Sequence, residues 1–373
     1  MGKKKRMVMG QFLSVCIALA LLSLFYNGQA QNVEAVKLYP IRLDAKAGYV
    51  DREGRIVIKP RFMRAWEFSE GLAPVQINDK PMFGYINKQG NFVIGPWQGL
   101  AFDFSEGLGL IFQRGGYGFI DPTGKVVISP QFGFAKSFSD GMAQVILNQC
   151  VPKVDCGMIG FADRSGTLVI KPQFRAAQDF HEGLAAVRRG DDEWMFIDKA
   201  GNEITKQHFK ADLKNSLVVT TDFSEGLAGV KVGDKWGYID KRGGMVIPPR
   251  FDEAGKFSER LAAVFIGCRW GYIDKTGAFV IKPQFKFASE FSEGIAAVDP
   301  RASGDVPCPP GKSHGKLGYI DKTGKLIINA QFDLAFKFID GIAKVVVVNP
   351  KDQNDLQYGY IDNAGQYIWK PTS

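Results

Sequence analysis

Histidine is scarce in this chain of 373 residues, with three in all, and His181, His208 and His314 stand in unrelated sequence contexts. The His-Glu-x-x-His pattern of zinc hydrolases does not occur. Acidic residues are plentiful, but no pair is set apart from the others. We therefore expect a protein that is not an enzyme, with no catalytic residue, no cofactor and no metal ion.

Long runs of one charge are also absent after the first few residues. The formal net charge is +8, and residues 1–30 hold four basic and no acidic side chains, so without them it falls to +4. Elsewhere, lysine and arginine alternate with aspartate and glutamate. A nucleic-acid-binding protein should carry a basic stripe, so we expect no nucleic acid partner.

Only one long apolar run exists, at residues 12–25. It follows a basic start and precedes the small residues Gly28 and Ala30, which is typical of a secretory signal peptide cut after Ala30. An uncleaved membrane anchor is the alternative, but the run is short for a span and two serines interrupt it. The sequence thus predicts an exported protein, periplasmic, cell-surface or extracellular, with no stable membrane span after cleavage.

Cysteine is rare as well, and one of the five, Cys16, lies in the signal segment. The remaining candidates for disulfides are Cys150, Cys156, Cys268 and Cys308. An even count in an exported chain favours disulfides. Four cysteines allow three connectivities, and proximity in the repeats favours 150–156 with 268–308. A zinc site is the alternative, although the spacing does not match paired Cys-x-x-Cys knuckles.

The rest of the chain, residues 31–373, repeats a single phrase and is interpreted as one domain. The phrase reads WGYIDKTGAFVIKPQFKFASEFSEGIAAV from Trp270. Shorter versions are GYVDREGRIVIKPRF from Gly48, GFIDPTGKVVISPQF from Gly118, GFADRSGTLVIKPQF from Gly160 and GYIDKTGKLIINAQF from Gly318. Self-similarity at a fixed period of this size indicates a repeat array.

Each repeat predicts a small antiparallel meander of three strands. Asp274 and Gly277 supply the chemistry of a tight hairpin between two β-prone runs. Pro283 is expected to end the second strand, and a connector with short helical turns should lead to the third strand near Ile295. Two phenylalanines six residues apart, such as Phe285 and Phe291, recur in the connectors and should fill a core between neighbouring repeats.

About nine such repeats fit the chain, starting near Leu38, Leu72, Leu108, Met142, Leu184, Leu227, Leu261, Ile295 and Ile342. One repeat is too small to bury a core alone, so neighbours must stack. The fold class is therefore all-β, a tandem array of three-stranded antiparallel meanders. Because both sequence ends coincide with repeat boundaries, we expect an open twisted solenoid, with a closed propeller-like toroid as the alternative.

Two recurring side chains are candidates for binding. One is a tyrosine row that could sit at a wet face and contact a partner, formed by Tyr49, Tyr85, Tyr238, Tyr272, Tyr319 and Tyr360. The other is the acidic residue of the FSEG motif, for example Glu293. It is interpreted either as a carboxylate that accepts backbone N–H groups at a turn or as one oxygen ligand in a calcium-binding row.

Departures from the repeat indicate where function could lie. The second full repeat reads GPWQGLAFDF from Gly95, and the repeat around Met195 has lost its Gly and Pro. Arg260 replaces the turn glycine, where a positive φ is costly, so that turn could differ. Longer inserts at 148–157, 299–316 and 349–358 share one structural slot, between a third strand and the next hairpin. Inserts in one slot emerge along one edge, often the binding edge.

The repeat resembles the WG repeat family, also called KWG repeats, which are β-rich bacterial repeats with a Trp-Gly step before GYID-x-x-G. Trp236-Gly237 and Trp270-Gly271 match that step fully. The resemblance implies a β-repeat surface used for binding or scaffolding and supplies no catalytic residues.

These observations together predict an exported, non-enzymatic binding or scaffold protein that contacts a protein or glycan partner. One alternative is a glycan-cleaving envelope enzyme with carboxylates set in a groove of the array. The other is a passive structural protein of the envelope.

Overall fold

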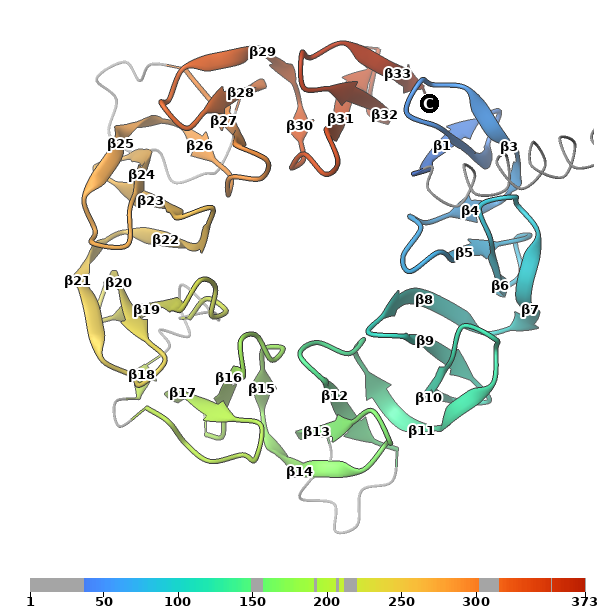
Figure 1. Cartoon of the computed structure of the whole chain (residues 1–373), viewed down its shortest axis with the longest axis horizontal. Helices are drawn as coiled ribbons and strands as arrows, with labels where there is room; N and C mark the ends of the chain where they lie inside the picture. Colours follow the sequence, from blue (N-terminus) through green and yellow to red (C-terminus); the bar gives the residue numbers. More distant parts are fainter. Residues whose placement is uncertain are drawn as a thin grey trace, which may run out of the picture.

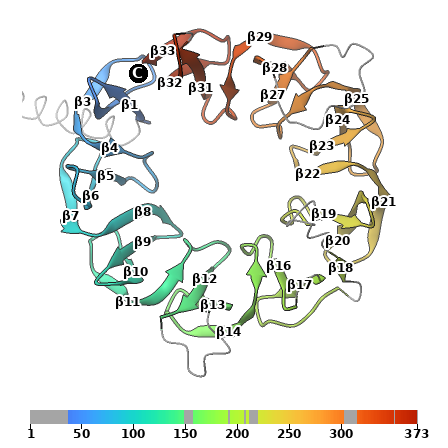
Figure 2. The same ribbon diagram turned by 180° about the vertical axis from the view of Figure 1, so that it is seen from behind.

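The computed structural model describes residues 37–148, 157–190, 193–205, 208–210, 220–301, 315–349 and 351–372. In this part of the chain every regular element is a β-strand, and paired strands are antiparallel. The strands form successive modules arranged around a ring (Figure 1), and Figure 2 shows the same ring from behind. Among these residues no helix is long and apolar enough to cross a membrane.

Each complete module has four strands in chain order, of which the fourth follows the outer rim in Figure 1. The first strands, most of them two residues long, are β4 (Arg64–Ala65), β8 (Leu100–Ser105), β15 (Ala176–Ala177), β22 (Glu253–Ser258), β26 (Phe287–Ala288) and β30 (Leu334–Ala335), of which β8 and β22 have six residues. The second strands are β1 (Tyr39–Leu43), β5 (Ala73–Gln76), β9 (Leu108–Gln113), β12 (Met142–Leu147), β16 (Leu184–Arg188), β19 (Leu227–Val232), β23 (Leu261–Ile266), β27 (Ile295–Asp299) and β31 (Ile342–Asn349).

The third and fourth strands form the hairpin recognised in the sequence. The third strands are β2 (Lys46–Val50), β6 (Met82–Ile86), β10 (Gly116–Ile120), β13 (Ile159–Asp163), β17 (Glu193–Asp198), β20 (Lys235–Asp240), β24 (Arg269–Ile273), β28 (Leu317–Asp321) and β32 (Asp352–Asp362). The fourth are β3 (Ile56–Phe62), β7 (Phe92–Gln98), β11 (Val126–Ala135), β14 (Leu168–Phe174), β18 (Phe209–Lys210), β21 (Met245–Phe251), β25 (Phe279–Phe285), β29 (Leu326–Phe332) and β33 (Tyr367–Thr372).

The predicted all-β array of three-stranded meanders is confirmed, with one addition. The connectors expected to contain short helical turns instead provide the short first strands. Thus Ala288 in β26 pairs with Val298 in β27. The long strand β11 serves both as the fourth strand of one module and as the first of the next, which joins the two modules in a seven-stranded sheet.

Pro283 does not end its strand, contrary to the sequence-based expectation, because β25 continues through it to Phe285. Pairing shifts between Trp270↔Phe285 and Tyr272↔Ile281, so β25 bulges opposite Gly271. A Cβ on Gly271 would lie 2.7 Å from both the Ile281 oxygen and the Pro283 nitrogen. The glycine is therefore needed because the bulged backbone occupies the place of a side chain.

The module containing Met195 supports this relation between the Gly and the Pro. It has lost both residues, and its fourth strand β18 is reduced to the two residues Phe209–Lys210. Met195 is buried where other modules have glycine. The glycine is tied to the bulged backbone itself: where Ala330 stands in place of the proline, Gly318 is kept, and a Cβ on it would lie 2.7 Å from the Ala330 nitrogen.

The core lies between neighbouring modules, as the phenylalanine spacing predicts. Phe285 and Phe291 are buried with Tyr272 and reach Ile320 of the following module. The rings of Tyr272 and Phe291 have centroids 4.7 Å apart, within the range of favourable aromatic pairs. Stacking therefore supplies the apolar burial that a single module lacks.

The first and last modules also share a core, and this closes the ring. Tyr39 and Ile41 of β1 are buried against Ile342 and Tyr360. The rings of Tyr39 and Tyr360 lie 5.2 Å apart. The contacts therefore correspond to the closed, propeller-like alternative and not to the open solenoid expected first. Module boundaries at the chain ends do not prevent closure, because it is made by side chains and needs no exchanged strand.

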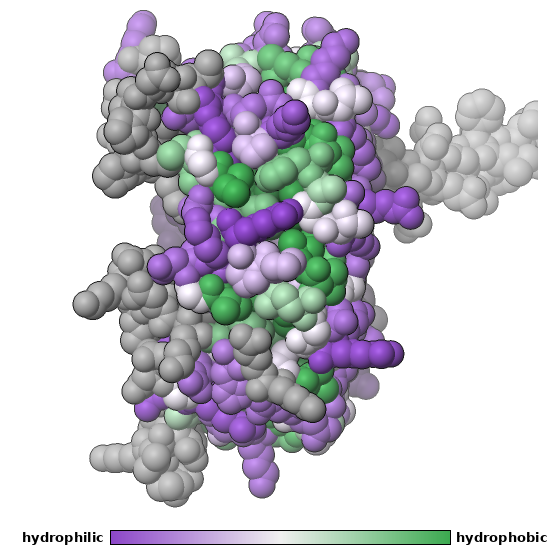
Figure 3. Space-filling view, turned by 90° about the vertical axis from the view of Figure 1, so that its left-hand side faces the viewer, coloured by the Kyte–Doolittle hydropathy of each residue, from purple (hydrophilic) through white to green (hydrophobic). Residues whose placement is uncertain are grey.

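The outer rim exposes apolar side chains in pairs at the start of the fourth strands. Met245 and Val246 of β21, and Phe279 and Val280 of β25, are each at least 38% exposed. Figure 3 shows hydrophobic side chains gathered over these outer strands, with hydrophilic side chains between them. Apart from β11, the fourth strands are edge strands, and the Pro and bulge later in the same strand oppose edge-to-edge pairing with another chain.

Candidate functional site

The tyrosine row predicted to bind a partner is part of the core. Five of its members, Tyr49, Tyr85, Tyr238, Tyr272 and Tyr319, have no exposed surface, and Tyr360 is 3% exposed. Each hydroxyl donates to a backbone carbonyl, as Tyr272 does to Ser289 at 2.9 Å. Burial raises the pKa of Tyr272. The prediction of a tyrosine binding row is wrong, because each ring is covered by the adjoining modules and its hydroxyl ties down a connector.

Replacing Tyr360 by phenylalanine tests this role at the point of closure. Its hydroxyl donates to the Pro40 carbonyl in the first module at 2.9 Å. Loss of this hydrogen bond should lower the free energy of unfolding by about 1 kcal/mol. The matched control is Tyr272→Phe, which removes the same bond inside the array. Denaturant titration should give similar losses for both variants, and a loss confined to Tyr272→Phe would contradict closure.

The FSEG motif forms a two-residue hairpin turn. Ser292 and Ile295 exchange both backbone hydrogen bonds. Glu293 and Gly294 between them have φ of 56° and 77°, as a type I′ turn requires. The Ser292 hydroxyl donates to the Phe338 carbonyl of the next module at 2.7 Å. The motif thus combines a turn with a link to its neighbour.

The FSEG carboxylates extend this link around the ring. Glu259 accepts the N–H of Gly294 in the next module at 2.9 Å and pairs with Lys322 at 2.9 Å. The same carboxylate-to-N–H contact joins Glu70–Gly107, Glu106–Gly141, Asp140–Gly183, Glu182–Gly226, Glu225–Arg260 and Glu293–Gly341. In the described residues, no three His, Cys, Asp or Glu side chains gather where they could hold a metal ion.

At the junction of the last and first modules a side chain replaces the N–H donor. Asp340 pairs with the Lys37 ammonium at 2.8 Å, and Lys37, one residue before Leu38, stands where other repeats have the turn glycine. The ion pair with Lys37 lowers the pKa of Asp340. Of the two interpretations of the acidic repeat, the turn carboxylate agrees better with the structure than the calcium-binding row. The carboxylate, however, accepts its main hydrogen bond from the next module and not from its own turn.

Acid should weaken these links. Burial alone would raise the pKa of Glu259, but hydrogen bonds from Lys322 and the Gly294 N–H outweigh it and lower that pKa. A lowered carboxyl pKa contributes stability above the unfolded value near 4.5, which is lost as pH falls through the folded value. Glu259→Gln should cost about 1 kcal/mol at pH 7 and less at pH 3. Urea titrations of both proteins from pH 7 to 3 measure this, and a constant difference would contradict it.

The turn containing Arg260 keeps the common geometry, although its sequence departs from the repeat. Arg260 has φ of 70°, and its N–H donates to Glu225 at 3.1 Å. A left-handed conformation costs a residue with a Cβ about 1 kcal/mol more than glycine. Arg260→Gly should therefore raise the free energy of unfolding by about that amount in a denaturant titration. A destabilised variant would show instead that the arginine side chain supports the turn.

Two connector carboxyls have raised pKa values. Desolvation raises the pKa of Asp103, although the residue is exposed, and the charge of Glu67 adds to the effect. Burial also raises the pKa of Asp222, against the opposing charge of His181, whose imidazole lies 3.5 Å from it. The two carboxyls belong to connectors of different modules, so they do not form a pair.

The loops between second and third strands all lie at one end of the strands, and we call this end the loop face. The FSEG turns and the Asp-x-x-Gly hairpins lie at the other end, because each strand runs from a turn to a loop or back. The inserts 148–157, 299–316 and 349–358 belong to the loop face. Residues 149–156 and 302–314 fall outside the described residues, whereas the third insert, apart from residue 350, extends the hairpin of β31 and β32. Repeated polar contacts thus occupy one end, and sequence variation occupies the other.

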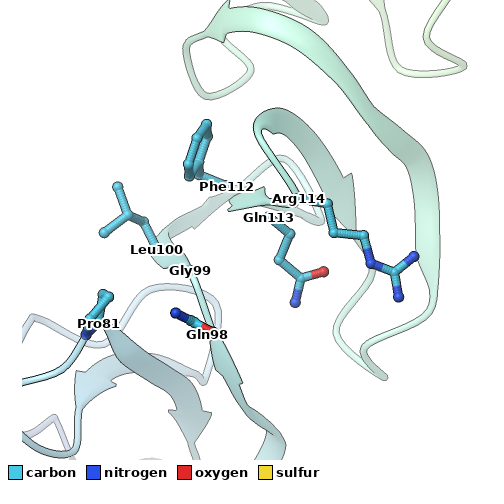
Figure 4. A pocket seen from close by; sticks show the side chains of 7 residues that line it. All are labelled: Pro81, Gln98, Gly99, Leu100, Phe112, Gln113 and Arg114. Carbon is cyan, nitrogen blue, oxygen red and sulfur yellow. The ribbon is translucent and has the colours of Figure 1, made fainter.

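A pocket of about 670 Å³ opens on the loop face, where the second and third modules meet. It is lined by Pro81, Gln98, Gly99, Leu100, Phe112, Gln113 and Arg114. Figure 4 shows Pro81 and Gln98 on one side, Gln113 and Arg114 on the other, and Leu100 and Phe112 beside each other above them. Two loops of the same structural slot thus face each other across the pocket.

This pocket lies where the sequence GPWQGLAFDF, which begins at Gly95, departs from the repeat. By register, Trp97 pairs with Phe83 as Phe285 pairs with Trp270, so the tryptophan replaces the missing phenylalanine. Its ring lies 5.8 Å from that of Tyr85. Gln98 and Gly99 then follow, and the Gly99 N–H donates to the Pro81 carbonyl at 2.9 Å. The altered phrase therefore changes both the core and the adjoining surface.

The insert 299–316 is fastened at its base by a buried carboxylate. Asp299 is fully buried and accepts the Gly315 N–H at 2.6 Å. Its other partner is the Arg301 guanidinium at 2.8 Å. Burial would raise the pKa of Asp299, but these hydrogen bonds outweigh it and lower that pKa. The insert thus leaves and rejoins the loop face at a fixed point.

Of the four cysteines predicted to form disulfides, only Cys268 lies within the described residues. It occupies the turn between β23 and β24, with φ of 69°, and it is disulfide-bonded. Cys150, Cys156 and Cys308 lie outside the described residues. The adjacent Arg269 donates to the Arg301 carbonyl at 2.9 Å, so this turn lies next to the base of the insert 299–316.

Sequence reasoning located the loop face and the GPWQGLAFDF departure but missed the pocket that they form. Arg114 and Gly115 have a left-handed backbone conformation and form a turn that nothing in the sequence distinguishes from other turns. The turn lies beside Pro81 only because the second and third modules stack. The extra signal in the sequence was the Gln-Gly step after Trp97.

The model of the WG containing repeat family matches the chain at residues 48–80, 83–116, 117–149, 159–191, 219–236, 236–267, 270–299 and 318–349. No curated protein matches the chain. Among solved structures, it is similar to the crystal structure of a eukaryotic initiation factor, with TM-score 0.62, 11% identity, and coverage of 90% of this chain and 96% of that chain. At this identity the likeness concerns the fold alone.

Two other solved structures are less similar. Dihydro-heme d1 dehydrogenase NirN in complex with DHE has TM-score 0.46 and 15% identity, with coverage of 83% of this chain and 76% of that chain. BamB from Moraxella catarrhalis has TM-score 0.39 and 9% identity, with coverage of 70% and 96%. The family model, in contrast, covers more than half of the chain. The protein therefore belongs to the WG containing repeat family.

Proposed function

We propose that this protein is an exported, non-enzymatic binding protein that holds a partner, preferably another protein, on its loop face. The repeated Tyr, Phe, Ser and Glu residues are engaged in contacts within and between modules. The parts of the chain that depart from the repeat remain available for a partner. The observation that carries the proposal is the pocket at the second module junction, on the same face as the inserts.

Electrostatics and anchoring support this assignment. Arg114 presents a cation at one side of the pocket, and Asp299 holds the base of the insert 299–316 to the ring. A rigid ring that carries variable loops suits selective binding, because the ring loses little conformational entropy when a partner binds. Binding a partner in this way involves no catalysed reaction.

A pull-down with the mature protein tests the proposal. Residues 303–315 and residues 152–155 are each replaced by a short Gly-Ser linker, and co-purifying partners are compared by mass spectrometry. Either replacement should weaken capture of at least one partner. The control is Arg242→Ser on a hairpin at the opposite end of the strands, and it should change nothing. Partners retained equally by all variants would contradict a role for the loop face.

Export predicts two covalent changes that can be measured: cleavage of the signal peptide and formation of disulfides. Cleavage after Ala30 predicts a mature chain that begins at Gln31, readable by N-terminal sequencing of protein from the native host. Disulfides at Cys150–Cys156 and Cys268–Cys308 should appear in non-reducing peptide maps. The disulfide bond of Cys268 supports the second pair, because the turn of Cys268 lies beside the insert that contains Cys308. A retained residue 1–30 segment with free thiols would contradict export.

A further inference from the structure

We propose that the pocket between the second and third modules binds the C-terminal carboxylate of a peptide whose last side chain is apolar. The inference rests on the proposed function and names the chemistry that the loop face would recognise. Three features of the pocket carry it: a cation on one side, an apolar wall and two amide side chains.

The cation is Arg114. It occupies the first position of a two-residue turn, where Arg114 and Gly115 have φ of 51° and 80°, so its backbone is fixed by the type I′ geometry. Its side chain is exposed, and within the described residues no carboxylate lies at salt-bridge distance from it. Arg55 and Arg301, in contrast, both pair with aspartates. A guanidinium without a partner matches a carboxylate through two parallel hydrogen bonds.

The apolar wall consists of Pro81, Leu100 and Phe112. Leu100 and Phe112 are directly paired across strands β8 and β9. Phe112 is supported by Tyr117, whose ring lies 4.9 Å away. A preorganised hydrocarbon surface of this size suits one leucine or phenylalanine side chain. The wall therefore favours an apolar terminal residue over a charged one.

The amides of Gln98 and Gln113 also line the pocket, on opposite sides in Figure 4. Neither side chain has a hydrogen-bond partner within the described residues. An amide both donates and accepts, so it can bond the N–H and C=O groups of a peptide backbone. An acidic sugar would instead present several hydroxyls to a wall of three hydrocarbon surfaces, which gives it fewer partners. The lining therefore favours a peptide terminus.

Fluorescence anisotropy on the full mature chain tests the proposal. The probes are N-terminally labelled tetrapeptides that end in leucine or phenylalanine, each as the free acid and as the C-terminal amide. The free acids should bind at least about tenfold more tightly than the amides, because a charge-assisted hydrogen bond to the guanidinium is lost. Arg114→Asn should remove that difference, since asparagine tolerates the left-handed turn.

The matched control is Arg260→Asn, which removes an arginine from the same turn conformation at the opposite end of the strands and should leave binding unchanged. Equal binding of acid and amide, or an Arg114→Asn variant that binds like the parent chain, would overturn the proposal. So would binding of a labelled oligogalacturonate by the same chain, with no binding of either peptide. If the pull-down still depends on the inserts in any of these cases, the proposed function stands and only the peptide-terminus inference fails.

Discussion

Replacing Gly271 by alanine is expected to destabilise the protein by about 3 kcal/mol, although it adds a single methyl group. The new Cβ would lie 2.7 Å from the Ile281 oxygen and 2.7 Å from the Pro283 nitrogen. Both are backbone atoms of the β25 bulge, so relief requires a shift of the outer strand. The free energy of unfolding from denaturant titration measures the loss.

A glycine in open space provides the control. A Cβ at Gly190 would meet nothing within 4 Å, and its φ is outside the left-handed range. Gly190→Ala should change stability by less than about 0.5 kcal/mol. If Gly271→Ala were as mild, the Gly of the repeat would serve some purpose other than admitting the bulge.

The second large effect is expected at the closure of the ring. Ile41 is 5% exposed and packs with Val50, Ile342 and Tyr360, of which the last two belong to the final module. Ile41→Ala should lower the free energy of unfolding by about 3 kcal/mol, through lost burial and the cavity left behind. Denaturant titration followed by circular dichroism measures it.

The corresponding residue inside the array is Val298, which is fully buried, and Val298→Ala is the matched control. In a closed ring both truncations cost a substantial amount, because each position is covered by a neighbouring module. If Ile41→Ala were neutral while Val298→Ala was costly, the first module would have a free face and the ring would be open.

Local structure was predictable because its chemistry is local. Asp274 was predicted to organise a hairpin through its own backbone, and its carboxylate accepts the N–H groups of Thr276 and Ala278 at 2.9 and 3.0 Å. The burial of Phe285 and Phe291 was predictable for a similar reason, because the same six-residue spacing of two phenylalanines recurs from repeat to repeat. In contrast, the path of β25 through Pro283 depends on a glycine in the partner strand.

Polar contacts between repeats, unlike the phenylalanine core, were beyond the reach of the sequence pattern. The acceptor role of Glu259 depends on Gly294, 35 residues away, and nothing local distinguishes it from an ordinary turn carboxylate. The burial of Tyr272 likewise depends on what the next module places over it. Closure follows from a small rotation per module that accumulates around the ring, and a single sequence carries no measure of that angle.

The pocket illustrates a third limit. The departure at Gly95 was visible as a broken pattern, but its consequence depends on Trp97 moving into the place of the repeat phenylalanine. Arg114 carried no signal, since a charged residue in a turn is usually a solvated surface residue. Its importance arises only when the ring brings the loops of two modules together.

Zero-length carbodiimide cross-linking of the native monomer tests closure of the ring most directly. Lys37 and Asp340 are 303 residues apart in sequence, and their Nζ and Oδ2 atoms lie 2.8 Å apart. Internal controls are Lys241–Glu182 at 3.0 Å and Lys316–Asp333 at 2.6 Å. The closed ring predicts a Lys37–Asp340 cross-link within one chain at a yield comparable with the controls. Efficient cross-linking of the controls without that product would contradict it.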